Sequence, residues 1–455
     1  LALRYLLLGD EEAAYRAGIL LARLAYVYPG LNYRWQQSRS GYLGRTGRAL
    51  IDGNWERGNL LVPALRAYDA IFEHLDNDTK LVVFLQQKDP SIQSPADVKA
   101  LLDTALVQVC GWDWIHRELT GGSQGSREQD MAEYIVCANM GEVSDRWLDE
   151  LFTHAWNGGL NKGGFDDAVM VNALARDGHT LVSGLGYALG YQSSKSDMAE
   201  IMSRVVSERW SGRANLFDER LYPKLRAEFD LWIDMEIAGQ FTSQYGDSGG
   251  GTTSRSSRGL PASNRAAYER AYRRWPDERI ARAIYRAGPR PPRLFEPDVW
   301  QAVQEHVERV GPQPPLESRV MDGVGFVMLE SRPHSEELAD RAGVAFRYGY
   351  ALGHHHNDNL NVELFAHGEN LAPELGYPTW AHPLGGTGDA VHHCTGMIDR
   401  SNQYPGAIGK GWVELFSAAP EASFADLAAA PSGFPNRMYR RAICLADAPE
   451  GNIYL

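Results

Sequence analysis

Apolar residues recur at helical spacing through residues 1–312 of the chain. Within residues 11–28, for example, Leu20, Leu24 and Val27 are separated by four and then three positions, which places them on one face of a helix. Successive helices with almost no alternating segments predict stacked helical hairpins, arranged as an α/α toroid or a solenoid, although no strict repeat is present. The same pattern predicts helices at residues 60–75, 96–119, 144–156, 197–210 and 222–237.

The pattern changes after Pro315 to short runs rich in β-branched and aromatic residues. These runs predict strands at residues 323–329, 343–350, 360–366 and 411–417. A helical half followed by a strand-rich half is typical of an α+β protein. We therefore predict a helical domain at residues 1–312 and an antiparallel β-sheet domain at residues 313–455, the latter truncated at its C-terminus.

Composition and charge narrow the class of protein. The 455 residues carry a formal net charge of −13, which argues against a nucleic-acid-binding protein, because such proteins normally present a basic face. No run of about 18 apolar residues occurs, so no membrane span is predicted. Because the chain begins at Leu1 without a Met, we expect a fragment whose targeting signals are missing. The cysteines are widely scattered and predict no disulfide framework: Cys110, Cys137, Cys394 and Cys444.

The densest cluster of chemically active residues is residues 353–360, with the sequence GHHHNDNL. If this segment is a strand, His354 and His356 alternate and present their side chains on one face. One imidazole can then bind a metal ion while its neighbour faces a cleft. A solvated polar loop is the alternative interpretation.

Further metal-binding residue types follow at Glu374 and at the pair His392 and His393. Together, His356, Glu374 and His393 offer two nitrogens and one carboxylate oxygen, which is a chemically sound ligand set for zinc, with His392 as a reserve. Taken alone, Glu374 and His393 each also fit an ordinary surface role.

A candidate for proton transfer lies in residues 177–191, with the sequence DGHTLVSGLGYALGY. The Asp-Gly pair predicts a turn, and Tyr187 and Tyr191 follow at i, i+4 spacing on a predicted helix. A tyrosine acts as a general acid or base if nearby positive charge lowers its pKa. Simple buttressing of the helix by the two rings is the alternative.

Two other polar segments are candidates for substrate contacts. Arg127, Glu128 and Gln129 open a predicted helix, where capping is the alternative role. Tyr245 and Asp247 lie in the loop QYGDSGG, where Asp247 could hold sugar hydroxyls or an arginine, and a plain polar turn is the alternative.

These segments together resemble the heparinase II/III-like polysaccharide lyases. Residues 354–378 resemble the family's H-x-H-x-D-x-L motif with the strand and acidic residue that follow it, and residues 393–403 are similar to a strand that supplies a further histidine. Residues 177–187 resemble the segment that carries the catalytic tyrosine, and residues 318–331 resemble the opening strand of the sheet domain. The resemblance implies an incomplete α/α toroid joined to antiparallel β-sheets, with the active site between them.

The resemblance also implies roles for individual residues. Tyr187 matches the catalytic tyrosine and His354 the catalytic histidine, and a structural zinc ion is implied at His356, Glu374 and His393. The implied substrate is an acidic, uronate-containing polysaccharide, and the implied location is periplasmic or secreted. The sequence does not indicate an oligomeric state.

Three positions depart from the family pattern. The acidic ligand is Glu374 where the family usually has Asp, and Val182 stands where the tyrosine segment usually has Glu. The residue that neutralises the substrate carboxylate has no clean counterpart, and Gln129 is the best stand-in.

The implied reaction is β-elimination, which must neutralise the substrate carboxylate, remove the C5 proton and protonate the leaving O4. We assign neutralisation to Gln129, with help from Arg127 or His354, because preset hydrogen-bond donors stabilise the developing charge. Tyr187 would donate to O4, and either Tyr187 or His354 would accept the C5 proton.

Three other functions remain open on the sequence. The first is a zinc hydrolase that uses the H-x-H-x-D motif to activate water. The second is a toroid glycoside hydrolase with two carboxylates, for which Asp177 and Asp247 are candidates. The third is a glycan-binding protein without catalytic activity.

Overall fold

The computed structural model divides the chain into two compact units, Leu1–Val169 with Asp197–Leu216, and Met170–Ser196 with Phe217–Leu455. It describes residues 1–31, 57–111, 132–133, 135–136, 142–153, 165, 170–171, 174–180, 184–248, 260, 264–291, 293–294, 296–313, 317–331, 337–349, 354–376, 388–403, 411–430, 439–448 and 451–454.

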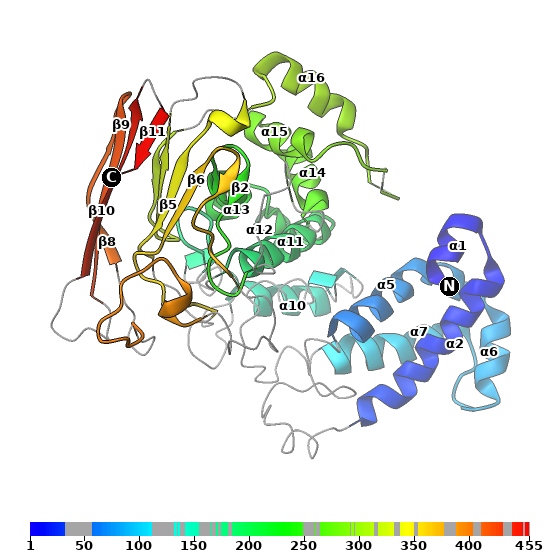
Figure 1. Cartoon of the computed structure of the whole chain (residues 1–455). Helices are drawn as coiled ribbons and strands as arrows, with labels where there is room; N and C mark the ends of the chain where they lie inside the picture. The colour runs from blue at the N-terminus through cyan, green and yellow to red at the C-terminus, as the bar shows by residue number, and fades with distance from the viewer. Residues whose placement is uncertain are drawn as a thin grey trace. The chain divides into compact units, whose positions relative to one another are not determined.

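All of the described secondary-structure elements of the first unit are helices (Figure 1). Helix α2 shows why: Asp10 accepts a hydrogen bond from Ala13 N at 3.0 Å, which caps the first turn, and Ala14, Leu21 and Ala25 bury one face. The described elements of this unit are α1 (Ala2–Leu8), α2 (Glu11–Val27), η1 (Tyr28–Gly30), η2 (Arg57–Leu61), α5 (Val62–Ile71), η3 (His74–Asp76), α6 (Thr79–Gln86), α7 (Pro95–Leu102), η4 (Asp103–Gly111), α10 (Glu142–Thr153) and α12 (Ser211–Ala214).

The second unit joins helices to three antiparallel sheets. Its helices are α13 (Pro223–Asp234), α14 (Arg265–Arg274), α15 (Glu278–Arg286) and α16 (Trp300–Val310), and α11 (Leu185–Met202) begins in it. The five-stranded sheet has the order β3 (Arg319–Met321), β4 (Phe326–Glu330), β5 (Gly343–Arg347), β6 (Val362–Ala366) and β7 (Glu369–Asn370). The four-stranded sheet has the order β11 (Gly451–Tyr454), β10 (Tyr439–Ala448), β9 (Ala422–Ala429) and β8 (Gly411–Ala418), and the shorter elements are β1 (Glu236–Ile237), β2 (Phe241–Thr242), η6 (Leu338–Asp340) and η7 (Ala390–His392).

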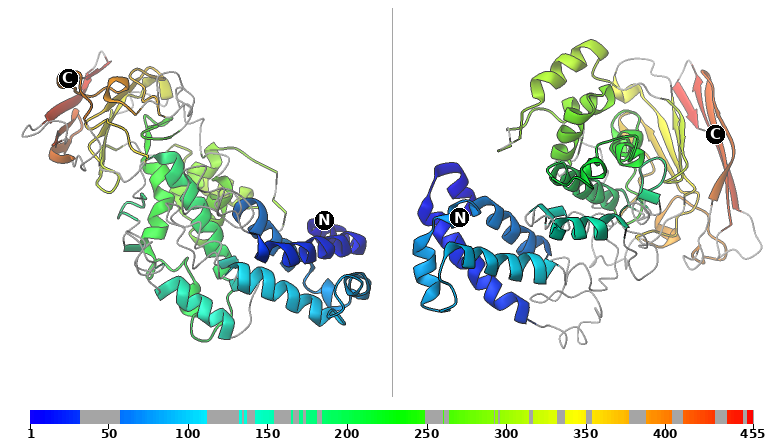
Figure 2. Two further views of the ribbon diagram at one scale, coloured as in Figure 1. Left: turned by 90° about the horizontal axis from the view of Figure 1, so that it is seen from below. Right: turned by 180° about the vertical axis from the view of Figure 1, so that it is seen from behind.

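The two larger sheets of the second unit pack face to face, as both views of Figure 2 show. Val327 and Phe346 of the five-stranded sheet share one buried core with Leu427 and Leu445 of the four-stranded sheet. Strands β4 and β5 are buried along their whole length, which explains why their sequences are nearly continuous apolar runs. The predicted antiparallel sheets are therefore confirmed, and the strand at 343–350 ends earlier than predicted, at Arg347.

Buried charged residues of the second unit pair with each other and with the backbone. Glu330, at the end of β4, accepts a hydrogen bond from Ala238 N at 3.0 Å and pairs with Arg319 at 3.3 Å. Burial raises the pKa of Glu330 to about 7, and the charge of Arg319 only partly opposes this effect. Helix α11 has a comparable anchor, because Lys195 lies 2.7 Å from Glu228 of α13 with both side chains buried.

The described helices before residue 312 confirm a helix-rich part, while the toroid and the domain boundary at 312 stay predictions. The helix predicted at 197–210 is wrong in its extent, because α11 begins at Leu185 and ends at Met202 and turns follow. Within the described ranges no helix is long and apolar enough to cross a bilayer.

Candidate functional site

The histidine-rich segment is a loop between β5 and β6, not the predicted strand. His354 has a φ of 50°, a left-handed backbone conformation that is uncommon for a residue with a side chain. Such conformations persist where the surrounding structure holds them, often at functional sites. His354 and His356 therefore do not share a face through strand alternation, and a common partner brings them together instead.

That common partner is Asp247, in the loop between β2 and α14. Its Oδ2 lies 2.7 Å from His354 Nδ1, and its Oδ1 lies 3.1 Å from His356 Nε2. Its backbone nitrogen also donates to His354 O at 3.0 Å. Burial raises the pKa of Asp247, but the hydrogen bonds and charges of the two imidazoles outweigh burial and hold it well below its usual range. Both carboxylate oxygens of Asp247 are therefore engaged by the histidines, and its role as a sugar contact stays a prediction.

Tyr187 completes the accessible side of the site. It lies in the first turn of α11, as the spacing predicted, and its ring stacks on the His354 imidazole with centroids 3.9 Å apart and planes at 20°. Burial raises its pKa, and the negative charge of Asp247 raises it further. The hydroxyl therefore keeps its proton near neutral pH, which suits a proton donor better than a base.

The three predicted metal ligands come together in the second unit. The candidate ligand atoms of His356, Glu374 and His393 all lie within 4.8 Å of one another. Glu374 Oε2 lies 2.9 Å from His393 Nδ1, and both side chains are fully buried. Among the described residues, the buried atoms His356 Nδ1 and His393 Nε2 have no hydrogen-bond partner. Buried nitrogens without partners are costly unless they bind something, so this donor set fits a zinc ion.

A second layer of polar contacts holds Glu374 in place. Asn361 Nδ2 donates to Glu374 Oε2 at 2.7 Å, and Gly376 N donates to Oε1 at 3.2 Å. Gly376 has a φ of 58°, and a Cβ at this position would meet Ser248 O at 2.2 Å, so only glycine lets this loop approach the Asp247 loop. Sequence reasoning missed Asn361, because an Asn five positions after His356 carries no motif of its own.

Asp358, the acidic residue of the H-x-H-x-D motif, does not join the metal cluster. It is 2% exposed and forms an ion pair with Arg347 of β5, which is also buried. The guanidinium of Arg347 in turn lies 5.1 Å from the centre of the Tyr245 ring. Asp358 therefore anchors the histidine loop to the sheet.

Burial rules out one predicted substrate contact, Tyr245, and leaves Tyr191, a further candidate for substrate binding, as a prediction. Tyr245 is 1% exposed and its hydroxyl contacts His179 Nε2, so it is a core residue and has no surface for a glycan. Tyr191 lies one turn after Tyr187 on α11, half-buried, with Lys195 Nζ 5.8 Å from its ring centre. Arg127, Glu128, Gln129 and Val182 lie outside the described residues.

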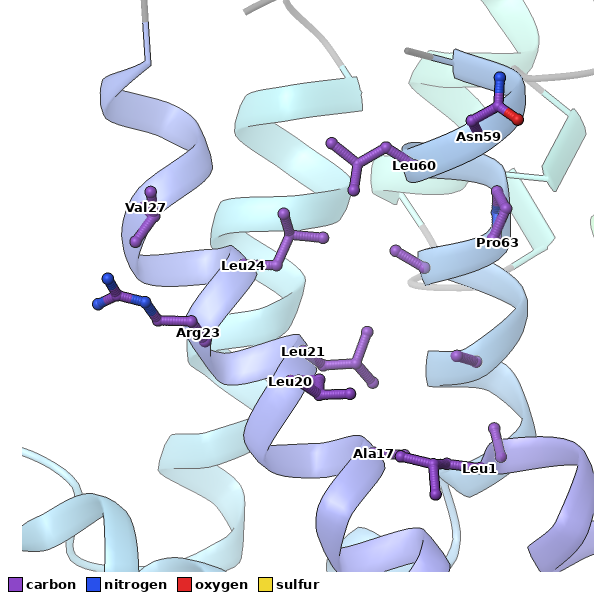
Figure 3. A pocket seen from close by; sticks show the side chains of 13 residues that line it. Leu1, Ala17, Leu20, Leu21, Arg23, Leu24, Val27, Asn59, Leu60 and Pro63 are labelled. Atoms are coloured by element: carbon purple, nitrogen blue, oxygen red, sulfur yellow. The ribbon is translucent and has the colours of Figure 1, made fainter. Parts of the chain in front are cut away.

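A separate apolar groove of about 560 Å³ lies in the first unit, between α2 and the residues from η2 to α5 (Figure 3). Leu20, Leu24 and Leu60 line it, and Arg23 is its one charged lining residue. Among the described residues, none of the predicted catalytic or metal-binding residues lines this groove.

No family model matches the chain, and no curated protein matches it by sequence. Several solved structures match it in fold. A heparan sulfate lyase, HepC, from Pedobacter heparinus is 14% identical with a TM-score of 0.55, over 97% of this chain and 58% of that one. Two structures of heparinase III are each 12% identical, with TM-scores of 0.59 and 0.56. They align with 97% and 90% of this chain and with 60% and 56% of theirs.

The likeness shows that the chain has the fold of these lyases, in which helices are joined to antiparallel sheets. The chain spans 56% to 60% of the length of the three matched structures. Since the identities are low, the likeness establishes the fold alone.

Proposed function

We propose that the chain is a polysaccharide lyase that cleaves an acidic, uronate-containing glycan by β-elimination. The observation that carries this proposal is the stacked pair of Tyr187 and His354, 3.9 Å apart between ring centres. An elimination needs a base and an acid at one point in space, and these two residues are 167 positions apart in the sequence (354 − 187). The fold shared with heparan sulfate lyases supports the same reaction class.

The geometry supports a division of labour between the two side chains. His354 Nδ1 contacts Asp247, so its Nε2, which has no partner among the described residues, is the nitrogen that can take the C5 proton. Tyr187, whose pKa is raised by burial and by Asp247, would donate its proton to the leaving O4. Gln129, helped by Arg127, stays the candidate for neutralising the substrate carboxylate.

A zinc ion at the buried cluster would supply a structural cross-link between the loops that carry His356, Glu374 and His393. A catalytic zinc keeps an open coordination position for water or substrate. Here the side chains are 3%, 0% and 0% exposed, which favours a structural ion over a water-activating one. This burial argues against a zinc hydrolase. So does Asp358, which forms an ion pair with Arg347 and does not join the metal cluster.

The glycoside hydrolase alternative also loses support. It would need two available carboxylates. Asp177 accepts hydrogen bonds from the backbone nitrogens of His179 and Val324, and Asp247 is engaged by two histidines. A periplasmic or secreted location stays a prediction.

A substrate screen tests the proposal. The purified chain is incubated with heparan sulfate, chondroitin sulfate, hyaluronan and alginate, and with a neutral glucan as control. We expect new ultraviolet absorbance from the C4–C5 double bond with at least one uronate glycan and none with the glucan. New reducing ends without this absorbance would indicate a hydrolase, and binding without any product would indicate a glycan-binding protein.

A further inference from the structure

Asp247 makes three contacts with the histidine loop. One oxygen meets His354 Nδ1, the other meets His356 Nε2, and the backbone nitrogen donates to His354 O. An ionised carboxylate only accepts hydrogen bonds, so His354 Nδ1 and His356 Nε2 must each carry a proton. The contacts with Asp247 therefore determine the tautomer of each neutral imidazole ring.

The two rings are fixed in opposite tautomers. With its proton on Nδ1, neutral His354 has its lone pair on Nε2, the nitrogen without a described partner. With its proton on Nε2, neutral His356 has its lone pair on Nδ1, which is buried and without a partner among the described residues. The first lone pair can accept a substrate proton, and the second can bind a metal ion.

We propose that Asp247 is a positioning residue that sets the tautomers of His354 and His356 together, and so couples the base of the reaction to the metal cluster. The proposal rests on the proposed function for the role of His354 as a base, and on the cluster geometry for His356. Metal-binding histidines commonly donate their second ring N–H to a carboxylate, and here that carboxylate is shared with the reactive histidine.

The local structure supports a positioning role for Asp247. His354 holds a φ of 50°, and Asp247 contacts it through both its backbone and its side chain, which fixes the ring and the strained backbone at once. The Asp247 loop is itself held, because Gly186 N of α11 donates to Ser248 Oγ at 3.1 Å. This contact joins the loop to the helix that carries Tyr187.

The test combines Asp247→Asn with spectroscopy and kinetics. An amide has only one accepting oxygen in place of two, so one histidine loses its acceptor. We expect kcat to fall about 10–100-fold with KM nearly unchanged, and zinc affinity to fall by a similar factor. The matched control is Asp389→Asn, which removes an exposed carboxylate bonded to Asn402 in the segment that carries His393.

Nitrogen-15 NMR of labelled histidines in the zinc-loaded wild-type protein gives a readout that a purely structural role would not move. We expect the His354 proton on Nδ1 and the His356 proton on Nε2, each assigned by substitution. A His354 proton on Nε2, or an Asp247→Asn protein with wild-type kcat, zinc affinity and spectra, would overturn the proposal. If Asp247→Asn does not fold, the wild-type spectrum alone decides.

The two proposals fail in different ways. If no uronate glycan gives unsaturated product, the lyase proposal fails, while the tautomers and zinc affinity still test Asp247. If product forms but the histidines carry their protons on the other nitrogens, the Asp247 proposal fails alone.

Discussion

His354 and His356 touch the same carboxylate and sit two positions apart, yet their surroundings differ sharply. The His354 side chain is 35% exposed and stacks on Tyr187, while the His356 side chain is 3% exposed and faces Glu374 and His393. A side chain that exchanges protons with a polysaccharide must be reachable, and a structural metal ligand is best kept from water. Under the proposed function, exposure more than residue type distinguishes the catalytic role of His354 from the structural role of His356.

The accessible side of the comparison is tested by removing the tyrosine hydroxyl. In Tyr187→Phe we expect turnover to fall about 10³-fold or more, because proton transfer to the leaving group is lost while the ring stays. The measurement is the rate of ultraviolet absorbance gain, with thermal melting and zinc content unchanged. Tyr191→Phe, one turn further along α11, is the control and should stay near wild type. A reversed result would move the acid to Tyr191.

The buried side is tested with a pair of alanine variants. His356→Ala should lose the bound zinc, measured by elemental analysis as a drop from about one equivalent to none, because a structural site needs its full ligand set. The free energy of unfolding should fall on the order of 5 kcal/mol, since metal binding contributes to folding. His354→Ala should keep the zinc but lose turnover. Zinc that depends on His354 and His355 instead would contradict the assignment.

The anchor of the histidine loop gives a smaller expected effect. Asp358→Ala leaves Arg347 as a buried charge without its carboxylate and should lower the free energy of unfolding by about 3 kcal/mol, measured by urea denaturation. Because Asp358 does not belong to the cluster, zinc bound by the folded variant should stay near one equivalent. A loss of zinc without a loss of stability would indicate that Asp358 binds the metal.

The smallest expected effect concerns Glu330, a buried carboxyl group outside the histidine loop. It tests whether burial alone shifts a pKa in this unit. The pKa of Glu330 is raised from 4.5 to about 7 by burial, so its contribution to stability is present below pH 4.5 and lost as the pH rises through 7. Glu330→Gln has no carboxyl group to ionise, so its free energy of unfolding does not fall with pH for this reason. Its stability relative to wild type should therefore improve between pH 5 and pH 8.5 by about 1–2 kcal/mol in urea titrations. An unchanged difference across this range would contradict the raised pKa.

The sequence was informative wherever chemistry or periodicity is local. Helix α2 and strands β4 and β6 follow from spacing and run length, because each buries a face or a whole strand that its own residues define. The metal-binding residue types were recognisable from their donor atoms, and the structure brings all three together. Their occupancy by zinc stays a prediction.

Sequence alone failed where a role depends on a distant partner. The sequence did not reveal that Asp247 bonds two histidines from a loop more than 100 positions away. It also predicted Tyr245 as a substrate contact, but this ring is buried beside His179. The histidine segment looked like a strand, and its loop conformation depends on contacts with Asp247 and Arg347.

What the sequence by itself determined is therefore the change from helices to antiparallel strands and the donor atoms available for acid–base and metal chemistry, because both are properties of short segments. The tertiary structure decided which nitrogen of each histidine meets Asp247, which of them is reachable and which is buried. The physical reason is that hydrogen-bond direction and exposure depend on groups brought together from distant parts of the chain. A local sequence pattern does not specify these long-range contacts.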